Sequence, residues 1–363
     1  QISYQELDNY FSARLADGRL RGQVVEDIYR LSGLQEGMLF HGLYEHGHSS
    51  YIEQVSCRLR GVDKDIFIRS WESVIRRHSI LRSGFEPGFF GIPVQCVYSD
   101  VVLPLYEADY RGLDASAQSS AIGAYAEQDR RRGFSFDEVP LLRLSLLQTG
   151  HMEYRMIWTY HHLLLDGWST PLLVEELLEV YEQLSSGAAG GDIMIDEYGD
   201  YIRYMDSKDA GSSQSYWREY LSGLETGSLL PFIGPSAVRT KGVGEYKELS
   251  LRLDASESVQ VESYGQKHRL TVNTIMQGVW AYLLHSYTGQ SDVVYGVTVS
   301  GRPDDLAGVE RRIGMYINTL PLHGHIEPSM GIVEWLTGIQ ASQLASREHQ
   351  YSSLSDIQQW TGI

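Results

Sequence analysis

The sequence predicts an α/β protein with two lobes. Its 363 residues are more than one ordinary hydrophobic core accommodates, which favours two domains or lobes. Strand-like alternation and helical periodicity follow one another along the chain. A helix pattern that contains Trp71 precedes strand patterns in the first half, and a helix pattern over 272–287 precedes a strand pattern over 292–299 in the second half. This weak echo fits two similar lobes.

Local patterns predict the elements of the first half in order. The opening segment, to about residue 28, is helix-like because its few apolar residues lie at helical spacing. Alternation and apolar periodicity then predict strands at 51–59, 93–98 and 154–162 and helices at 63–78 and 115–132.

A further helix and a linker complete this half. Thr170 and Pro171 are typical of an N-cap and a first helical position, and the apolar stripe after them predicts a helix that ends before Gly187. The small-residue tract 185–191 is the best linker candidate. We therefore expect lobes at 1–188 and 189–363.

Composition excludes several classes of protein. The apolar fraction of 42% and the charged fraction of 21% are typical of a globular protein. Forty-seven acids against thirty bases give a net charge of −17, which argues against a nucleic-acid partner and against an anionic membrane surface. The cluster 130–132, three arginines, is a candidate local basic patch, although a solvated charge run is the simpler interpretation.

The cysteines and the start of the chain predict its compartment. Cys57 and Cys96 each lie in a strand-like stretch, and we expect buried thiols without a redox or metal role. The chain contains no run of eighteen apolar residues and shows no signal-peptide pattern at its start. We therefore expect a cytoplasmic protein.

The most informative segment is the run 161–169, His-His-Leu-Leu-Leu-Asp-Gly-Trp-Ser. It places two histidines at the end of an apolar strand and an Asp-Gly turn shortly after them. A general base over a closely approached backbone suits acyl transfer to an amine or an alcohol. Alternation along the strand puts His162 on the face of Trp158 and Tyr160, and His161 on the opposite face. If the site lies on the aromatic face, His162 is the working residue and His161 contributes packing.

With these residues identified, the chain resembles a condensation domain of a nonribosomal peptide synthetase, a relative of chloramphenicol acetyltransferase. The 161–169 run resembles the family's third signature, which wax-ester and related acyltransferases share, so it is only moderately specific alone. The other segments that resemble signatures occur in the family's order, at 31–41, 77–85, 198–202 with 216–221, 313–321 and 349–354. Six signatures in order cover nearly the whole chain.

The resemblance implies a fold and a reaction. The fold is a V-shaped pseudo-dimer of two acetyltransferase-like lobes, each a mixed sheet with packed helices, with the motif in the first lobe. The reaction is attack by the α-amine of a carrier-bound aminoacyl thioester on an upstream carrier-bound thioester, which forms an amide without a covalent enzyme intermediate. The domain itself binds no cofactor, because the substrates arrive on phosphopantetheine arms of donor and acceptor carrier domains. Adenylation and epimerization domains are the implied neighbours.

The resemblance also implies roles for the motif residues. His162 takes the proton of the amine or orients it, since an imidazole titrates near neutrality, whereas His161 has a structural role. Asp166, counted with the catalytic motif, forms a buried ion pair with Arg82 of the second signature. The backbone N–H of Gly167 faces the thioester carbonyl oxygen, or Gly167 is simply a turn glycine; both interpretations stay open.

Residues outside the motif are assigned supporting roles. Trp217 is expected to pack at the lobe interface, and Asn318 to hold a loop beside the substrate channel. The segment at Arg302 resembles the stretch by which the second lobe crosses to the first.

The first signature identifies a subtype. Its Gln-Glu-Gly-Met-Leu-Phe-His sequence at 35–41 resembles domains that follow an epimerization domain and join a D-configured donor to an L-configured acceptor. Gly33 stands where the family commonly has proline. The family's domain normally continues beyond the position of Ile363, so we expect a second lobe that is truncated at its end, and a missing strand would leave a sheet edge exposed.

Other functions remain as alternatives. A catalytically idle carrier-binding module would have the same fold, although idle relatives usually degrade the intact histidine motif. An epimerization-type relative carries the same histidines but a different first signature. A free-standing acyltransferase that uses coenzyme A leaves the first, fourth and sixth signatures unexplained.

Overall fold

The computed structural model describes residues 3–16, 24–44, 51–187, 195–224, 226–232 and 249–363. The chain divides into two compact units. Unit 1 comprises Gln1–Ser207 and Arg302–Tyr316, and unit 2 comprises Lys208–Gly301 and Ile317–Ile363. Each unit is described by itself.

Unit 1 contains two sheets. The first has the strand order β1-β4-β3 and the second, a mixed sheet, has the order β2-β7-β6-β5, in which only the β5–β6 pair is parallel. The strands are β1 (Val25–Arg30), β2 (Ile52–Arg60), β3 (Ser83–Glu86), β4 (Val94–Tyr98), β5 (Leu105–Asp109), β6 (Leu142–Gly150) and β7 (Glu153–His161).

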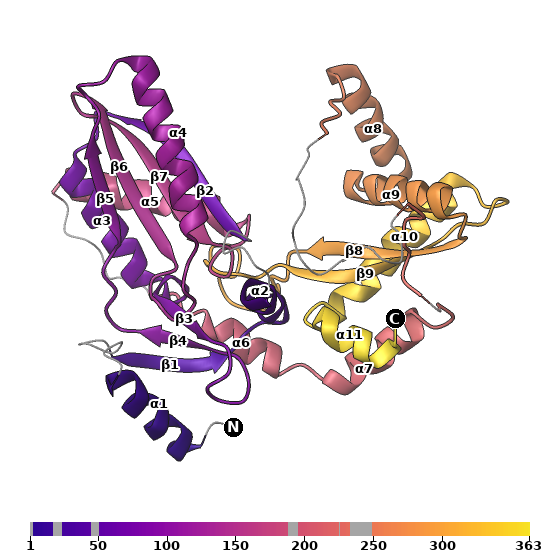
Figure 1. Cartoon of the computed structure of the whole chain (residues 1–363). Helices are drawn as coiled ribbons and strands as arrows, with labels where there is room; N and C mark the ends of the chain where they lie inside the picture. The colour runs from indigo at the N-terminus through magenta and orange to yellow at the C-terminus, as the bar shows by residue number, and fades with distance from the viewer. Residues whose placement is uncertain (1–2, 17–23, 45–50, 188–194, 225, 233–248) are drawn as a thin grey trace. The chain divides into compact units, whose positions relative to one another are not determined.

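Helices cover both faces of the four-stranded sheet (Figure 1). On one face lies α4 (Ala115–Arg132), and on the other lie α3 (Lys64–Arg77) and α5 (Ser169–Ser185), which pack against each other. The amphipathic α3 begins at the N-cap Asp63, whose side chain accepts from the N–H of Ile66. The other helices of unit 1 are α1 (Tyr4–Ala16), α2 (Gly33–Tyr44) and α6 (Gly199–Asp206), with a 3-10 turn η1 (Ser79–Arg82).

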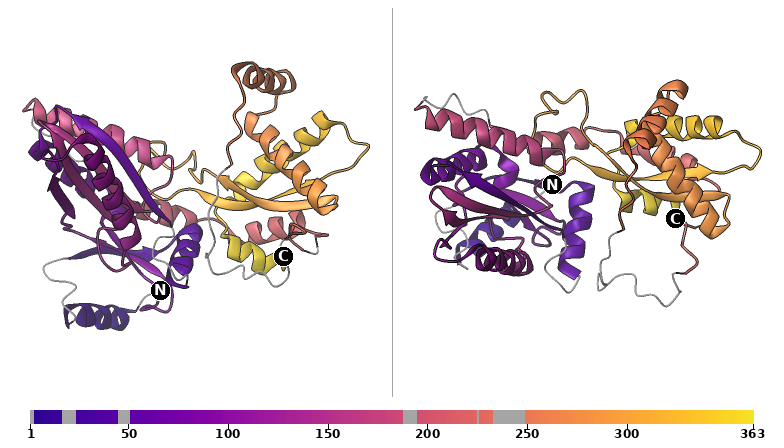
Figure 2. Two further views of the ribbon diagram at one scale, coloured as in Figure 1. Left: turned by 45° about the horizontal axis from the view of Figure 1, so that its top comes forward. Right: turned by 90° about the horizontal axis from the view of Figure 1, so that it is seen from above.

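In unit 2, the described strands form a two-stranded antiparallel sheet, β8 (Asp292–Val299) with β9 (Asn318–His325). Two layers of helices cover it, as Figure 2 shows from two further directions. On one side lie α7 (Ala210–Tyr220) and α11 (Leu354–Thr361), and on the other lie α9 (Val272–Thr288) and α10 (Ile332–Ser346). Helix α8 (Ala255–His268) precedes α9, and a 3-10 turn, η2 (Arg347–His349), follows α10.

The α/β class is confirmed, and three local expectations need correction. Residues 25–30 form strand β1, not the end of an opening helix, because they pair with β4. Helix α5 begins at Ser169, one residue before the expected N-cap Thr170. Strand β7 ends at His161 and not at residue 162.

The compact units also divide the chain differently from the expected boundary at 188/189. Helix α6 belongs to unit 1, where it packs on β1. The segment 302–316 returns to unit 1 as well; there the Tyr201 hydroxyl donates to the carbonyl of Tyr316 at 3.2 Å. Most of the expected linker, 188–191, lies outside the described residues.

Candidate active site

Strand β7 delivers the histidines to the end of the four-stranded sheet. It runs between β2 and β6, so both of its edges are paired. Its residues alternate as the sequence predicts: Trp158 packs its ring on Trp71 of α3, whereas the Thr159 hydroxyl meets the Gln54 amide, which donates to a carbonyl of α4. His161 is the last strand residue, and His162 opens the loop 162–168, which we call the motif loop.

His161 is a packed and neutral residue. Its side chain is 3% exposed and its ring lies edge-on to Phe136, with centroids 5.3 Å apart. Nδ1 accepts the backbone N–H of Leu163 at 3.1 Å, which places the ring proton on Nε2. Burial and the neighbouring His162 lower the pKa of His161 to about 3, so the ring stays uncharged near neutral pH.

His162 has a different environment. Its backbone N–H donates to the carbonyl of Tyr51 at 2.8 Å, which fixes the main chain. Its ring nitrogen Nδ1 is buried, yet it has no hydrogen-bond partner among the described residues. No carboxylate in the described part of the chain contacts the ring either, so its tautomer is not set by an acid as in a Ser-His-Asp triad.

Asp166 is the anchor of the motif loop. It is 1% exposed, and its carboxylate accepts the N–H of Ser169 at 2.7 Å and the N–H of Tyr316 at 3.0 Å. The N–H of Asp166 donates to the carbonyl of Gly314 at 3.1 Å. The carboxylate thereby caps the first turn of α5, where a negative charge is favourable, and it fixes residues 313–316, which we call the strap.

The expected ion pair between Asp166 and Arg82 is wrong. The cation beside Asp166 is Arg302, whose Nη2 lies 3.5 Å from Asp166 Oδ1. Arg82 instead contacts Glu26 at 2.6 Å and donates to the carbonyl of Tyr98. The physical reason is the return of the segment 302–316 to unit 1, which brings in a guanidinium from a distant part of the sequence.

Ser169 completes this buried cluster. Its hydroxyl donates to the carbonyl of Gly314 at 2.7 Å and accepts from the N–H of Gly314 at 3.0 Å and from Arg302 at 2.9 Å. The guanidinium of Arg302 also lies over the ring of Tyr316, 4.2 Å from its centroid. Sequence reasoning missed both Ser169 and the pairing role of Arg302; the serine directly after Asp-Gly-Trp was the available signal.

Gly167 is exposed and unobstructed. A Cβ at this position would meet no atom within 4 Å, and its φ is not positive. Neither space nor backbone conformation therefore requires glycine here. Its N–H has no acceptor among the described residues, so it is free to contact a substrate oxygen.

The first signature contacts the motif loop. Gln35, a buried residue of α2, donates from Nε2 to the carbonyl of Leu163 at 3.0 Å. Its Oε1 accepts the N–H of Ser32 at 3.0 Å. Gln35 therefore connects α2 to the motif loop, a contact between the first and third signatures that the sequence did not reveal.

Trp217 and Asn318 belong to unit 2. Trp217 is fully buried in a core with Leu221, Leu320 and Ile357. The Asn318 amide donates to the carbonyls of Gln350 and Ser352, each at 2.8 Å. Trp217 therefore packs the interior of unit 2 itself, and Asn318 holds the loop that precedes α11.

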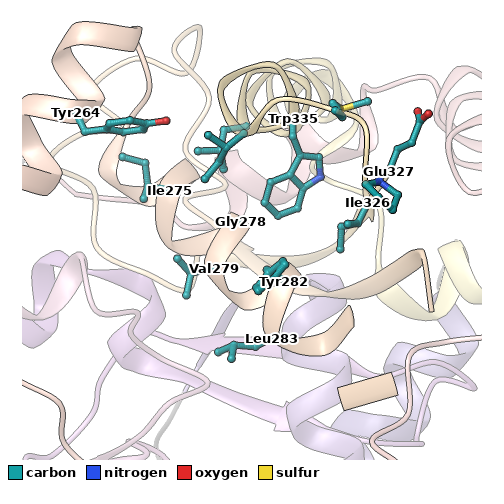
Figure 3. Close-up of a pocket in the computed structure, with 13 residues that line it drawn as sticks. Tyr264, Ile275, Gly278, Val279, Tyr282, Leu283, Ile326, Glu327 and Trp335 are labelled. Atoms are coloured by element: carbon teal, nitrogen blue, oxygen red, sulfur yellow. The ribbon is translucent and has the colours of Figure 1, made fainter. Parts of the chain in front are cut away.

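Two cavities lie within unit 2. The first, of about 440 Å³, is a mostly apolar groove between α9 and α10; in Figure 3, Tyr264 and Glu327 lie at its two ends with Trp335 between them. It contains no histidine. The second, of about 480 Å³, lies between the start of α9, the β8–β9 sheet and the end of α10. Two glutamine amides in its lining are unpartnered among the described residues, at Gln277 Oε1 and Gln343 Nε2.

The described residues contain neither a metal cluster nor a membrane span. No group of three or more His, Cys, Asp or Glu side chains there is arranged to hold a metal ion. None of the described helices is both long enough and apolar enough to cross a membrane.

Comparison with known proteins gives consistent matches. The Condensation domain family matches residues 25–362. The chain is 35% identical over 361 residues to part of the linear gramicidin synthase of Brevibacillus parabrevis, covering 99% of this chain and 4% of that protein. It is 32% identical over 335 residues to bacitracin synthase 1 of Bacillus licheniformis, covering 92% and 6%. The chain thus spans a small part of the relatives it matches.

Solved structures share the fold. A four-domain nonribosomal peptide synthetase bound to AMP and glycine has a TM-score of 0.74 at 20% identity, over 94% of this chain and 25% of that chain. The first condensation domain of the calcium-dependent antibiotic synthetase, with a substrate analogue, has a TM-score of 0.70 at 20% identity, over 93% and 79%. An X-domain in complex with OxyB from teicoplanin biosynthesis has a TM-score of 0.75 at 19% identity, over 94% and 74%.

Proposed function

The chain belongs to the Condensation domain family, and from this premise we propose that it joins two carrier-bound substrates through an amide bond. Condensation domains of nonribosomal peptide synthetases catalyse this acyl transfer on carrier-bound substrates. The acceptor is the α-amine of an aminoacyl thioester, and the donor is an aminoacyl or peptidyl thioester.

The reaction balances without a covalent enzyme intermediate. The amine nitrogen attacks the donor carbonyl carbon, so a carbon–nitrogen bond forms and the carbon–sulfur bond breaks. The proton lost by the amine passes to the departing sulfur. His162 accepts or orients that proton through the ring nitrogen that is unprotonated, and the N–H of Gly167 donates to the carbonyl oxygen as negative charge develops there.

The observation that carries this proposal is the contrast within the motif loop. Asp166 is fully occupied by the fold, through two backbone N–H groups and Arg302. His162 Nδ1 and the N–H of Gly167 have no partner among the described residues. Groups that the fold leaves free on a rigid support are the ones available to a substrate. In this proposal Asp166 and His161 are positioning residues, and His162 and Gly167 contact the reacting atoms.

Substrates carried on phosphopantetheine arms fit the second cavity of unit 2. A phosphopantetheine arm contains secondary amides, each with one N–H and one carbonyl oxygen. Gln277 Oε1 and Gln343 Nε2 offer an unpartnered acceptor and an unpartnered donor in that cavity, and leaving them unpaired is unfavourable. The domain would then need no cofactor of its own.

Subtype, partners and location complete the proposal. The first signature supports a D-configured donor and an L-configured acceptor, and hence an epimerization domain upstream. The partners are a donor carrier domain, an acceptor carrier domain and an adenylation domain, with no nucleic acid or membrane. The two free cysteines support a cytoplasmic location.

A condensation assay with defined carriers tests the proposal. The donor carrier is loaded with a D- or an L-aminoacyl group, the acceptor carrier with an L-aminoacyl group, and the product is detected by mass spectrometry. We expect an amide from the D-donor and little or none from the L-donor. Product from the L-donor alone would overturn the subtype, and no product from either donor, with both carriers shown to be loaded, would overturn the activity.

A second candidate function is supported by one comparison. The X-domain found in complex with OxyB matches this fold as well as the condensation domains do. Fold likeness alone is therefore compatible with a module that recruits another protein. Loaded carriers that bind the chain without forming product would favour this function.

A further inference from the structure

A buried histidine outside the motif bridges two carboxylates. His78, 3% exposed, lies directly after α3. Its Nε2 is 2.8 Å from Glu176 of α5, and its Nδ1 is 3.1 Å from Asp196. A carboxylate only accepts hydrogen bonds, so both ring nitrogens must carry a proton to make the two bonds. The geometry therefore requires an imidazolium.

The charges around His78 are nearly balanced. Arg77 contacts Glu176 at 2.6 Å, and Arg312 lies 3.6 Å from Asp196. Burial favours a neutral ring, but the hydrogen bonds to Asp196 and Glu176 outweigh this effect and raise the pKa of His78. The same bond from His78, with Arg77, lowers the pKa of Glu176 against the effect of its burial.

Asp196 connects this histidine to the strap. Its Oδ2, the atom that contacts His78, also accepts the N–H of Ile313 at 2.8 Å. Its backbone is pinned to the end of α3, because its N–H donates to Arg77 and its carbonyl accepts from Ser79. The carboxylate is thus held at one end by His78 and holds the start of the strap at the other.

The strap is the element that fixes Asp166. Gly314 accepts the N–H of Asp166, and Tyr316 donates to its carboxylate. A continuous series of hydrogen bonds therefore leads from His78 through Asp196 and the strap to the motif loop. All of these groups belong to unit 1.

We propose that His78, as an imidazolium between Glu176 and Asp196, is a positioning residue that holds the strap and hence the motif loop in its reactive geometry. When the ring loses a proton, one of the two carboxylates faces a nitrogen lone pair in a buried site. The strap is then less firmly held. This inference rests on the proposed function for its effect on catalysis, but its structural part does not.

The inference predicts an unusual pH profile. A general base such as His162 makes turnover rise with pH. Loss of the His78 proton makes it fall again at higher pH, so that the wild type has a falling limb. His78→Gln, which cannot donate from both ends of its side chain, removes the limb and gives activity reduced several-fold across the pH range. His78→Arg, a permanent cation with five donors, retains activity at high pH.

The experiment measures turnover and hydrogen exchange in the full chain between pH 5.5 and 9. Exchange of the strap amides, corrected for intrinsic rates with β2 as the internal reference, reports on the strap without any need for catalysis. We expect exchange of Ile313 and Tyr316 to increase several-fold above the pKa of His78 in the wild type and to be raised at all pH values in His78→Gln. His151→Gln, at an exposed turn, is the matched control and leaves both readouts unchanged.

The outcomes separate the two proposals. Strap exchange in the wild type that does not change with pH would overturn the inference, as would an unaltered falling limb in His78→Gln. Pronounced pH-dependent exchange without any amide formation would support the inference and contradict the proposed function. If His78→Arg does not fold, Asp196→Asn provides the second test, because it breaks the same connection and must raise strap exchange at all pH values.

Discussion

Two sets of groups within nine residues of the chain contrast sharply. His161, Asp166 and Ser169 are buried and hydrogen-bonded, and each contacts a fixed part of unit 1. His162 and Gly167 lie between them, with a ring nitrogen and a backbone N–H that the described structure leaves unpartnered. The difference indicates that one set builds the motif loop and the other is available for chemistry. Substitutions should therefore divide cleanly between effects on stability and effects on turnover.

The largest expected effect is on the stability contribution of Asp166. Asp166→Ala removes the acceptor of two backbone N–H groups and leaves Arg302 buried without its partner, so we expect a loss of about 3–5 kcal/mol in the free energy of unfolding. Urea denaturation measures it. Double-mutant cycles of Asp166→Asn should give a coupling of about 0.5–3 kcal/mol with Arg302→Gln and none beyond error with Arg82→Gln. Equal couplings would contradict the pairing described here.

Gly167 belongs to the other set and should behave oppositely. Gly167→Ala places a methyl group in open space, so we expect the free energy of unfolding to change by less than about 0.5 kcal/mol. Turnover should fall about 100-fold, because the methyl group obstructs the approach to the N–H. Gly123→Ala, in the exposed middle of α4, is the control and should leave turnover unchanged. Unfolding of Gly167→Ala would show that the fold needs this glycine.

How much the sequence predicted depends on the range of the interaction. Period-two alternation placed the side chains of β7 correctly, because it is a local property of a strand. The partner of Asp166 was not predictable, since several arginines could neutralise a buried carboxylate and Arg302 is 136 residues away. The N-terminus of α5 was shifted by one residue because Asp166, which no helix pattern includes, caps Ser169.

Ser169 should give a smaller loss of stability. Ser169→Ala removes a hydroxyl that bonds both backbone groups of Gly314 and leaves them unsatisfied, so we expect a loss of about 1–3 kcal/mol. Thermal and urea unfolding both report it. Ser215→Ala removes an exposed hydroxyl that also bonds a backbone carbonyl and should cost less than about 0.5 kcal/mol. A similar cost at the two positions would mean that the strap is not held through Ser169.

The smallest effect is the pH dependence that His161 contributes. Its pKa of about 3 lies below that of an unfolded histidine, so the unfolded chain binds more protons below about pH 6.5. Stability is therefore lost as the pH falls from about 6.5 towards 3, by at most about 1.4 kcal/mol per pH unit. His161→Gln, whose amide oxygen can still accept the N–H of Leu163, should show a shallower decline in urea titrations over this range. Parallel declines would indicate that His161 is not held neutral.

The division between building and reacting groups is tested most directly at His162. Turnover with loaded carriers and the free energy of unfolding are measured on the same preparation of His162→Ala. Because Nδ1 has no partner in the described structure, we predict stability within about 0.5 kcal/mol of the wild type and a fall in turnover of about 10²–10⁴. Retained turnover, or a loss of stability comparable to that of Asp166→Ala, would contradict the account.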